Sequence, residues 1–200
     1  MQMQEVKTRG PYAKGVAKRE EVRQIALETF ARRGYRGATL REIADEAGLT
    51  VAGVLHYFDS KEELFTEVLR LRDAAAVEIT GPSPRDAAET LIRVVRHNAT
   101  VPGLVHLYMA LAVEGAVEGH PAQDYFQEHF ASLSDWIEGE IRELQSDGRI
   151  KLQVQPEMLA SIFMAAIDGL QLQWLHDPSI DMAERLSCLW NELILSPEQT

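Results

Sequence analysis

The sequence predicts an all-α protein of nine helices, and three observations carry that prediction. Apolar residues recur at helical spacing through most of the chain, with no convincing strand among them. At three predicted helix starts, Ser, Thr or Asp stands three residues before Glu, which is the pattern of a capping box. Proline or glycine separates the periodic stretches, so each stretch has a defined start or stop.

Charge divides the 200-residue chain into two parts. Residues 1–41 hold ten Lys and Arg against four Asp and Glu, whereas residues 73–200 hold seven against twenty. A basic end and an acidic remainder imply different partners, because a nucleic acid responds to the local field of a docking face and not to the total charge. The single cysteine, Cys188, excludes an internal disulfide, and packing is its expected role.

Residues 1–15 are predicted to form a flexible basic arm, because they contain Gly10, Pro11 and Gly15 and show no helical stripe. Basic side chains in and just after the arm are candidates for contacts with DNA phosphates or the minor groove. The alternative is a disordered, solubilising tail. These side chains are Lys7, Arg9, Lys14, Lys18 and Arg19.

An amphipathic helix is predicted after the arm. Its apolar repeat faces one side, and Gly34 is placed to close the helix in the C′ position. The repeat consists of Val22, Ile25, Ala26 and Phe30.

Residues 39–58 show two short helical patterns separated by a tight turn. We interpret this segment as a helix-turn-helix. Thr39 and the glutamate three residues later form a capping box for the first helix, which ends at Gly48. Two helices that cross steeply need a small side chain at the crossing and a φ-tolerant residue in the turn. Ala44 and Gly48 meet these two requirements.

The second helix of the motif is predicted over residues 50–57, with Thr50 as its N-cap. A further capping box, Ser60 with Glu63, opens an amphipathic helix that continues to about residue 76. An ordinary helical hairpin is the alternative interpretation of the motif, and these flanking helices argue against it.

With its flanks included, the segment over residues 16–76 resembles the N-terminal DNA-binding domain of the TetR family of transcriptional regulators. The resemblance implies a homodimer that binds double-stranded operator DNA, with a C-terminal ligand-binding and dimerisation domain over residues 77–200. The matching residues are Ala26, Phe30, Gly34, Tyr35, Thr39, Ile43, Ala44, Ala47, Gly48, Phe58, Ser60, Lys61, Glu62, Glu63 and Leu64.

Few side chains of the second motif helix can read bases directly. Val51 and Ala52 offer methyl contacts to thymine, and Gly53 allows the helix backbone to sit deep in the major groove. Arg41 lies on the preceding helix, at a position that often faces the major groove in the family, where its guanidinium can bind guanine bidentately. A solvated surface charge is the alternative for Arg41.

The resemblance also implies phosphate contacts, which fix register and not sequence. Thr50, Tyr57 and Lys61 match positions that commonly make such contacts in the family. Where the family pattern usually has tyrosine, seven residues after the turn glycine, this chain has Leu55. That backbone contact is therefore either lost or supplied by His56 or Tyr57, although a histidine on a helix surface is often only solvated.

Prolines and one further capping box, at Asp181, divide the C-terminal region into five predicted helices. A proline suits the first turn of a helix because its missing N–H would be unpaired there. Gly148 is placed to end the longest of the five. The predicted ranges are 84–99, 102–116, 121–147, 156–176 and 181–195.

The last two helices are apolar on more than one face, so one face is expected to meet a second copy of the chain. A homodimeric four-helix bundle is the arrangement that the resemblance implies. A thick monomeric core is the alternative. The candidate interface residues are Ile162, Ala166, Leu170, Trp174, Leu186 and Trp190.

The resemblance implies a small-molecule effector of unknown identity, in a cavity that the middle helices enclose. Coupling to DNA binding is expected to run through the helix over residues 61–78. Apolar side chains of this kind are also ordinary core, and the sequence leaves both readings open. The candidate lining residues are Tyr108, Met109, Phe126, Phe130, Phe163 and Met164.

No cofactor, metal site or catalytic residue is predicted, since the chain has no HExxH, phosphate loop or nucleophile elbow. His120, Asp124 and Glu128 share a helix face, which is a weak pattern for a metal. No apolar run reaches the length of a membrane span, so a cytoplasmic protein is expected. Two other hypotheses remain: a DNA-binding dimer regulated by a protein partner, and a helical-bundle enzyme.

Overall fold

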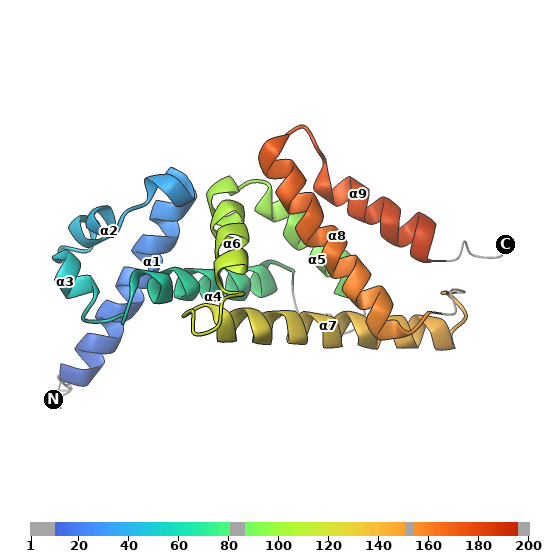
Figure 1. Cartoon of the computed structure of the whole chain (residues 1–200), viewed down its shortest axis with the longest axis horizontal. Coiled ribbons are helices and arrows are strands. Elements are labelled where there is room, and N and C mark those ends of the chain that lie inside the picture. Colours follow the sequence, from blue (N-terminus) through green and yellow to red (C-terminus); the bar gives the residue numbers. More distant parts are fainter. Residues whose placement is uncertain (1–10, 81–86, 151–153, 196–200) are drawn as a thin grey trace, which may run out of the picture.

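The computed structural model describes residues 11–80, 87–150 and 154–195, and over these ranges it has nine α-helices, one short π-helix and no strand. The prediction of an all-α, nine-helix protein is therefore confirmed (Figure 1). The elements are α1 (Pro11–Gly37), α2 (Leu40–Glu46), α3 (Val51–Val54), α4 (Lys61–Thr80), α5 (Ala87–Asn98), α6 (Pro102–Glu114), α7 (Gln123–Ser146), α8 (Pro156–His176), α9 (Met182–Cys188) and the π-helix η1 (Leu189–Ile194).

Helix α1 begins at Pro11, earlier than the sequence predicts, so the last five residues of the expected arm are helical. A proline is tolerated in a first helical turn because it has no N–H to leave unpaired. The first ten residues of that arm lie outside the described ranges. The helical backbone of α1 is broken at Gly34, whose φ is +70°, which is where the sequence places the helix end.

In all three predicted capping boxes, the Ser, Thr or Asp side chain caps its helix. The Glu42 backbone N–H donates to Thr39 Oγ1 over 3.2 Å, and the Glu63 backbone N–H donates to Ser60 Oγ over 3.0 Å. The Glu184 backbone N–H donates in the same way to Asp181 Oδ1, at 2.9 Å. These bonds satisfy amide groups that a helix start otherwise leaves unpaired, and they set where α2, α4 and α9 begin.

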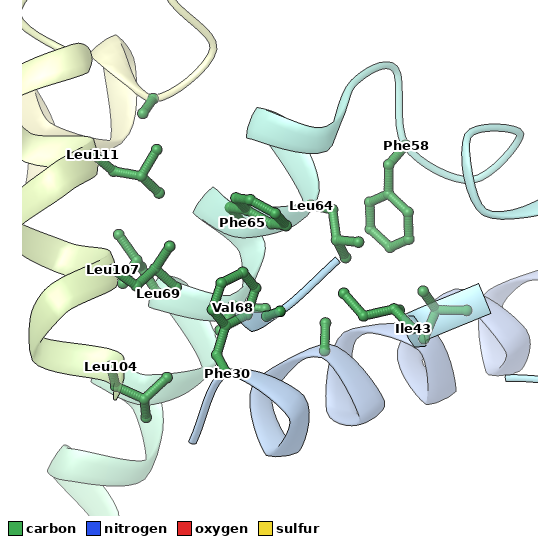
Figure 2. Close-up of a cluster of buried hydrophobic side chains, with 14 of the residues drawn as sticks. Phe30, Ile43, Phe58, Leu64, Phe65, Val68, Leu69, Leu104, Leu107 and Leu111 are labelled. Atoms are coloured by element: carbon green, nitrogen blue, oxygen red, sulfur yellow. The ribbon is translucent and has the colours of Figure 1, made fainter. Parts of the chain in front are cut away.

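The first hydrophobic core joins the N-terminal helices α1–α4 to α6 and α7. Phe30 of α1 and Phe65 of α4 meet edge to face, with ring centroids 4.5 Å apart. Figure 2 shows Leu104, Leu107 and Leu111 of α6 reaching toward the same cluster from the C-terminal domain. Because α6 shares one core with α1 and α4, the N-terminal helices do not pack around a separate core of their own.

The second core lies in the C-terminal part of the chain, among α5, α7, α8, α9 and η1, and α6 contributes Val105 to it. Phe163 of α8 is fully buried there, and its ring centroid lies 5.0 Å from that of Trp190 in η1. In Figure 1, α8 crosses above α7, and α9 runs along the outer side. Two of the predicted interface residues, Leu186 and Trp190, therefore pack inside their own subunit.

The C-terminal helices follow the predicted ranges within a few residues. Pro102 and Pro156 occupy the first turns of α6 and α8, as expected. Gly148 has a φ of +71° just beyond α7, which fits its predicted role as a helix terminator. The π-helix at the end of α9 is absent from the sequence-based prediction, because an i to i+5 ladder leaves no simple periodic signature. Pro84 lies outside the described residues.

Candidate DNA-binding interface and effector core

The unit formed by α2, its turn and α3 is held by its own backbone. Gly48 has a φ of +65°, a conformation that favours glycine, and the next N–H, that of Leu49, donates to the Ala44 carbonyl over 2.8 Å. The Gly53 backbone N–H donates to Thr50 Oγ1 over 3.0 Å, which caps α3. Helix α3 ends at Val54, and a turn replaces the last predicted turn of helix, so the motif helix is shorter than expected.

Most of the predicted DNA-contacting residues lie on the surface of this unit. They come from α2, from α3 with the turn after it, and from the first turn of α4. Gly53 and Tyr57 are half-buried, and Tyr57 packs against the first core. The exposed residues are Arg41, Thr50, Val51, Ala52, His56 and Lys61.

Two basic residues just after the predicted arm, Lys18 and Arg19, bind backbone carbonyls of the helix-turn-helix segment. Lys18 Nζ donates to the Ala47 carbonyl oxygen over 2.6 Å, at the end of α2. Arg19 Nε donates to the Tyr57 carbonyl oxygen over 3.3 Å, and the guanidinium carbon lies 4.7 Å from the centre of the Phe58 ring. Both side chains are engaged at the ends of the motif, which favours a structural role, and their predicted contact with DNA phosphate stays a prediction.

Other arginines of α1 pair with carboxylates on α2. Arg32 Nη2 lies 2.6 Å from a Glu46 carboxylate oxygen, and Arg33 Nε lies 2.9 Å from one of Glu42. Within the described ranges, Arg41 forms no ion pair and its side chain is exposed. Ion pairs within the protein therefore neutralise much of the positive charge of the N-terminal segment. The guanidinium of Arg41 is not used in such a pair in the described part of the chain and is available to an external partner.

Leu55 takes the place of the tyrosine expected by resemblance, and its side chain is exposed. Its neighbour His56 is exposed as well, with its ring 5.5 Å from that of Tyr57. An exposed imidazole can donate a hydrogen bond to phosphate, which an alkyl side chain cannot.

The predicted effector-lining side chains fall into two groups. Tyr108, Phe126 and Phe130 pack in series, with centroid distances of 5.4 Å and 5.9 Å, against the first core. Phe163 and Met164 belong to the second core. Met109 packs against both cores and so lies between the groups. Tyr108, Phe126 and Phe163 are buried, and the other three are half-buried.

A polar network that the sequence did not indicate joins α4 to α7. Arg72 Nη2 lies 2.7 Å from Asp73 Oδ1, while Asp73 Oδ2 accepts a hydrogen bond from the Tyr125 hydroxyl (2.6 Å) and lies 3.2 Å from His129 Nδ1. Burial alone would raise the pKa of Asp73, but Arg72 and His129 hold it well below its usual range. Burial, followed by the negative charge of Asp73, raises the pKa of the Tyr125 hydroxyl even though Arg72 opposes this.

The network continues to α6 and α8 through Tyr108. Its hydroxyl donates to Asp168 Oδ1 over 3.3 Å, and the Arg72 guanidinium carbon lies 4.5 Å from the centre of its ring. Burial raises the pKa of Asp168, although the Tyr108 hydroxyl works against that shift. Two buried polar atoms here, Arg72 Nη1 and Gln171 Oε1, have no hydrogen-bond partner among the described residues.

Helix α8 leaves one apolar stripe uncovered. Met158, Ile162 and Leu172 are each about half exposed, at 55%, 51% and 49%. The smaller residues Ala165 and Gly169 lie between them at helical spacing. By length and composition alone α8 could also cross a membrane, but the same test is passed by core helices of soluble proteins.

The remaining interface candidates differ in their burial. Trp174 is buried in the second core, whereas Ala166 and Leu170 are half-buried at its edge. Ile162 is thus the one predicted interface residue whose side chain is largely exposed.

The acidic and histidine residues of α7 do not gather into a metal site. His120 Nδ1 instead accepts a hydrogen bond from the Ala122 backbone N–H over 3.1 Å, just before the helix. Glu128 lies 3.5 Å from Arg70 Nη1 of α4. Across the described part of the chain, no three His, Cys, Asp or Glu side chains are grouped so that they could hold a metal ion.

Comparison with known proteins places this site in context. Residues 24–68 match the family model described as bacterial regulatory proteins, tetR family. The transcriptional repressor KstR2 of Rhodococcus jostii is 47% identical over 53 residues, which is 26% of this chain and 26% of that protein. The chain thus spans about a quarter of the length of this curated relative, in the segment that holds the helix-turn-helix.

Two comparisons extend over nearly the whole chain. The transcriptional repressor AcnR of Corynebacterium diphtheriae is 25% identical over 184 residues, covering 90% of this chain and 93% of that protein. A crystal structure of a putative transcriptional regulator from Saccharomonospora viridis in complex with choline superposes with a TM-score of 0.71. It is 25% identical and covers 91% of this chain and 100% of that chain.

Proposed function

The chain belongs to the tetR family of bacterial regulatory proteins, and on that premise we propose that it is a ligand-responsive transcriptional repressor that binds a palindromic operator as a homodimer. The observation that carries the proposal is the capped α3 with an unpaired arginine beside it, at Arg41. Regulators of this family are not enzymes, so the hypothesis of a helical-bundle enzyme is set aside.

In this proposal α3 enters the major groove. Val51 and Ala52 present methyl groups to base edges, and Gly53 lets the backbone approach closely. Arg41 reads guanine from α2, because its guanidinium is exposed and unpaired. Such a surface makes few hydrogen bonds to bases, so discrimination at each base pair is expected to be modest.

The phosphate contacts flank the groove. Thr50 and Lys61 lie at the starts of α3 and α4, where exposed polar side chains can reach the DNA backbone. We assign to His56 the contact that Leu55 cannot make. Tyr57 is half-buried, and its role is to anchor this turn to the core through its ring and its carbonyl.

The homodimer is proposed to form through the uncovered stripe of α8. Its exposed apolar side chains would be buried in a four-helix bundle with the partner copy, and small residues between them would let the helices approach. A two-fold dimer presents two copies of α3 to successive major grooves, which requires a palindromic site. A dimer of this kind would act in the cytoplasm, where its operator DNA lies.

The effector is proposed to act on the polar network around Tyr108. A ligand there can accept a hydrogen bond from Arg72 Nη1 and donate one to Gln171 Oε1, which would satisfy both orphaned atoms. Arg72 lies on α4, the helix that also starts beside the DNA-binding motif. A ligand that favours one arrangement of this network would therefore shift the position of α4 and the affinity for DNA.

A second candidate function keeps the DNA binding and replaces the small molecule by a protein partner. Its support is the close packing of Tyr108, Phe126 and Phe130, which contact one another. The solved relative in complex with choline favours a small molecule instead. A search by mass spectrometry for a co-purified compound separates the two candidates.

The test of DNA binding uses duplexes selected from a random-sequence library by the full chain. Replacing Arg41 by alanine is expected to weaken binding by roughly tenfold or more at fixed salt, since a bidentate contact to guanine contributes about 1–3 kcal/mol. The matched control is Arg142→Ala, an exposed arginine on α7 far along the chain from the motif. Equal affinities for both variants and the unchanged protein would contradict the proposed docking.

A further inference from the structure

A cavity of about 340 Å³ lies between α5, α7 and the α9–η1 segment. We call it the α5–α7–α9 cavity. None of the six side chains predicted to line an effector site borders it. It is therefore separate from the network around Tyr108, and the function proposed above does not use it.

Three arginines line this cavity. Arg93 and Arg96 lie one turn apart on α5, and Arg149 follows α7 directly after Gly148. The position of Arg149 is fixed by the helix terminator, since its backbone N–H donates to the Leu144 carbonyl over 2.8 Å. Only seven Lys and Arg occur after residue 72, against twenty Asp and Glu. Three of those seven line this one cavity, beside two of the twenty carboxylates, Glu89 and Glu140.

The carboxylates at the cavity do not neutralise all three guanidinium groups. Glu89 lies 3.4 Å from Arg93 Nη1, and Glu140 Oε2 accepts a hydrogen bond from the Ala88 backbone N–H over 2.8 Å. Neither Arg96 nor Arg149 has an ion-pair partner within residues 11–80, 87–150 and 154–195. Both guanidinium groups are thus available to an anion, and a guanidinium suits the planar oxygens of a carboxylate or phosphate.

The rest of the cavity lining supplies apolar and hydrogen-bonding surface. Ile92, Leu144 and Trp190 contribute apolar groups, while Asn191 contributes an amide. Trp190 and Asn191 belong to η1, in which the Leu195 N–H donates to the Trp190 carbonyl over 2.9 Å. A π-helix is rare, and such segments are found often at functional sites. Here it forms one wall of the cavity.

We propose that the α5–α7–α9 cavity binds a small organic anion, with a carboxylate or phosphate held by Arg96 and Arg149 and a compact apolar body against Trp190. Arg93 completes the positive wall but stays tied to Glu89 and to Thr90 Oγ1, 2.9 Å away. The site is an addition to the proposed repressor function. Its occupancy is measured without DNA, so its failure and the failure of the DNA-binding proposal are distinguishable.

The experiment titrates the full chain by calorimetry with three probes of one shape and different charge: benzoate, phenyl phosphate and benzylammonium. The two anions separate a carboxylate from a phosphate specificity. Saturable binding of at least one anion is expected, with the cation at least about tenfold weaker, since hydrogen bonds to charged groups contribute about that factor. Equal binding of the cation, or no saturable binding of either anion, overturns the proposal.

A variant and its control test the residues. Arg96→Gln with Arg149→Gln is expected to weaken the anion about tenfold or more. Both side chains are exposed, so the double variant is expected to keep the thermal unfolding of the unchanged protein. The control is Arg142→Gln, on α7 but outside the cavity lining, which is expected to leave anion affinity unchanged. Equal affinity of the double variant and the unchanged protein overturns the assignment.

Discussion

Gly103, in the first turn of α6, lies against Gly34 at the break in α1. A Cβ atom built on Gly103 would fall 2.1 Å from the Phe30 carbonyl oxygen and 2.9 Å from the Gly34 Cα. The backbones of α1 and α6 therefore touch directly here, and they lie too close together for a side chain to fit at Gly103. The C-terminal helix α6 therefore packs directly against α1. Helix α4 provides a second connection, because it contributes to the same core.

The first prediction concerns that crossing. Replacing Gly103 by alanine must push α6 away from α1, and we expect a loss of about 1–3 kcal/mol in the free energy of unfolding. Urea unfolding of the two proteins measures the difference. The control is Gly139→Ala on α7, where a Cβ meets nothing within 4 Å. That change should be neutral or stabilise by about 0.5–1 kcal/mol. Equal effects of the two variants would show that the crossing is not tight.

The second prediction concerns Arg19, which binds the Tyr57 carbonyl, faces the Phe58 ring and pairs with Glu63 of α4 over 3.2 Å. Removal of the side chain in Arg19→Ala should lower the free energy of unfolding by about 1–2 kcal/mol, because it removes several weak interactions at once. Lys14→Ala, at an exposed residue of the same helix, serves as the control. A stable Arg19→Ala protein that binds DNA poorly would instead return Arg19 to a direct role at the DNA.

The third prediction concerns the charge of Asp73. Replacement by asparagine leaves the guanidinium of Arg72 without its counter-charge, at an expected cost of about 3 kcal/mol at neutral pH. The double variant Arg72→Met with Asp73→Asn should be less destabilised than Asp73→Asn alone, because it removes the stranded charge as well. Urea unfolding at pH 7 compares the three proteins, and a double variant that is the least stable of them would contradict this account of the pair.

The same group predicts a dependence on pH. The pKa of Asp73 is lower in the folded protein than in the unfolded chain, so its contribution to stability is present above about pH 4 and is lost as pH falls below that value. Stability measured from pH 7 down to pH 3 should fall less steeply in Asp73→Asn than in the unchanged protein. Parallel curves would mean that Asp73 is not ionised preferentially in the folded state.

The fourth prediction concerns the stripe on α8. Ile162→Glu places a charge where an apolar contact with a second copy is proposed, and we expect the dimer to dissociate at micromolar concentration. Sedimentation velocity measures the change. Val113→Glu, at an exposed apolar residue near the end of α6, is the matched control and should remain dimeric. Dissociation of both variants, or of neither, would argue against an interface on this face.

Features set by neighbours in sequence were predictable. Thr39, Gly48 and Thr50 act within four residues of themselves, through caps and one turn, and the structure has them where the sequence indicates. The helix limits set by Pro102 and Pro156 were predictable for the same reason. Local steric rules operate before any tertiary contact forms, so they can be read from the chain alone.

Features that depend on distant contacts were not predictable. Arg19 and Tyr57 are 38 residues apart, and no periodicity signals that an arginine on α1 will bind the carbonyl after α3. Leu186 and Trp190 look like interface residues because they are apolar, yet their own subunit buries them. The network around Asp73 joins distant helices, and its members look like ordinary surface residues in the sequence. Tertiary packing decides such roles.

The most direct measurement is the mass of the protein bound to a selected palindromic duplex, determined by native mass spectrometry and repeated across a series of salt concentrations. Two subunits per duplex are predicted, with affinity whose logarithm falls linearly with the logarithm of the salt concentration as phosphate contacts release counterions. A single subunit on the DNA, or no salt-dependent affinity for any duplex, would contradict the account of this protein as a dimeric repressor.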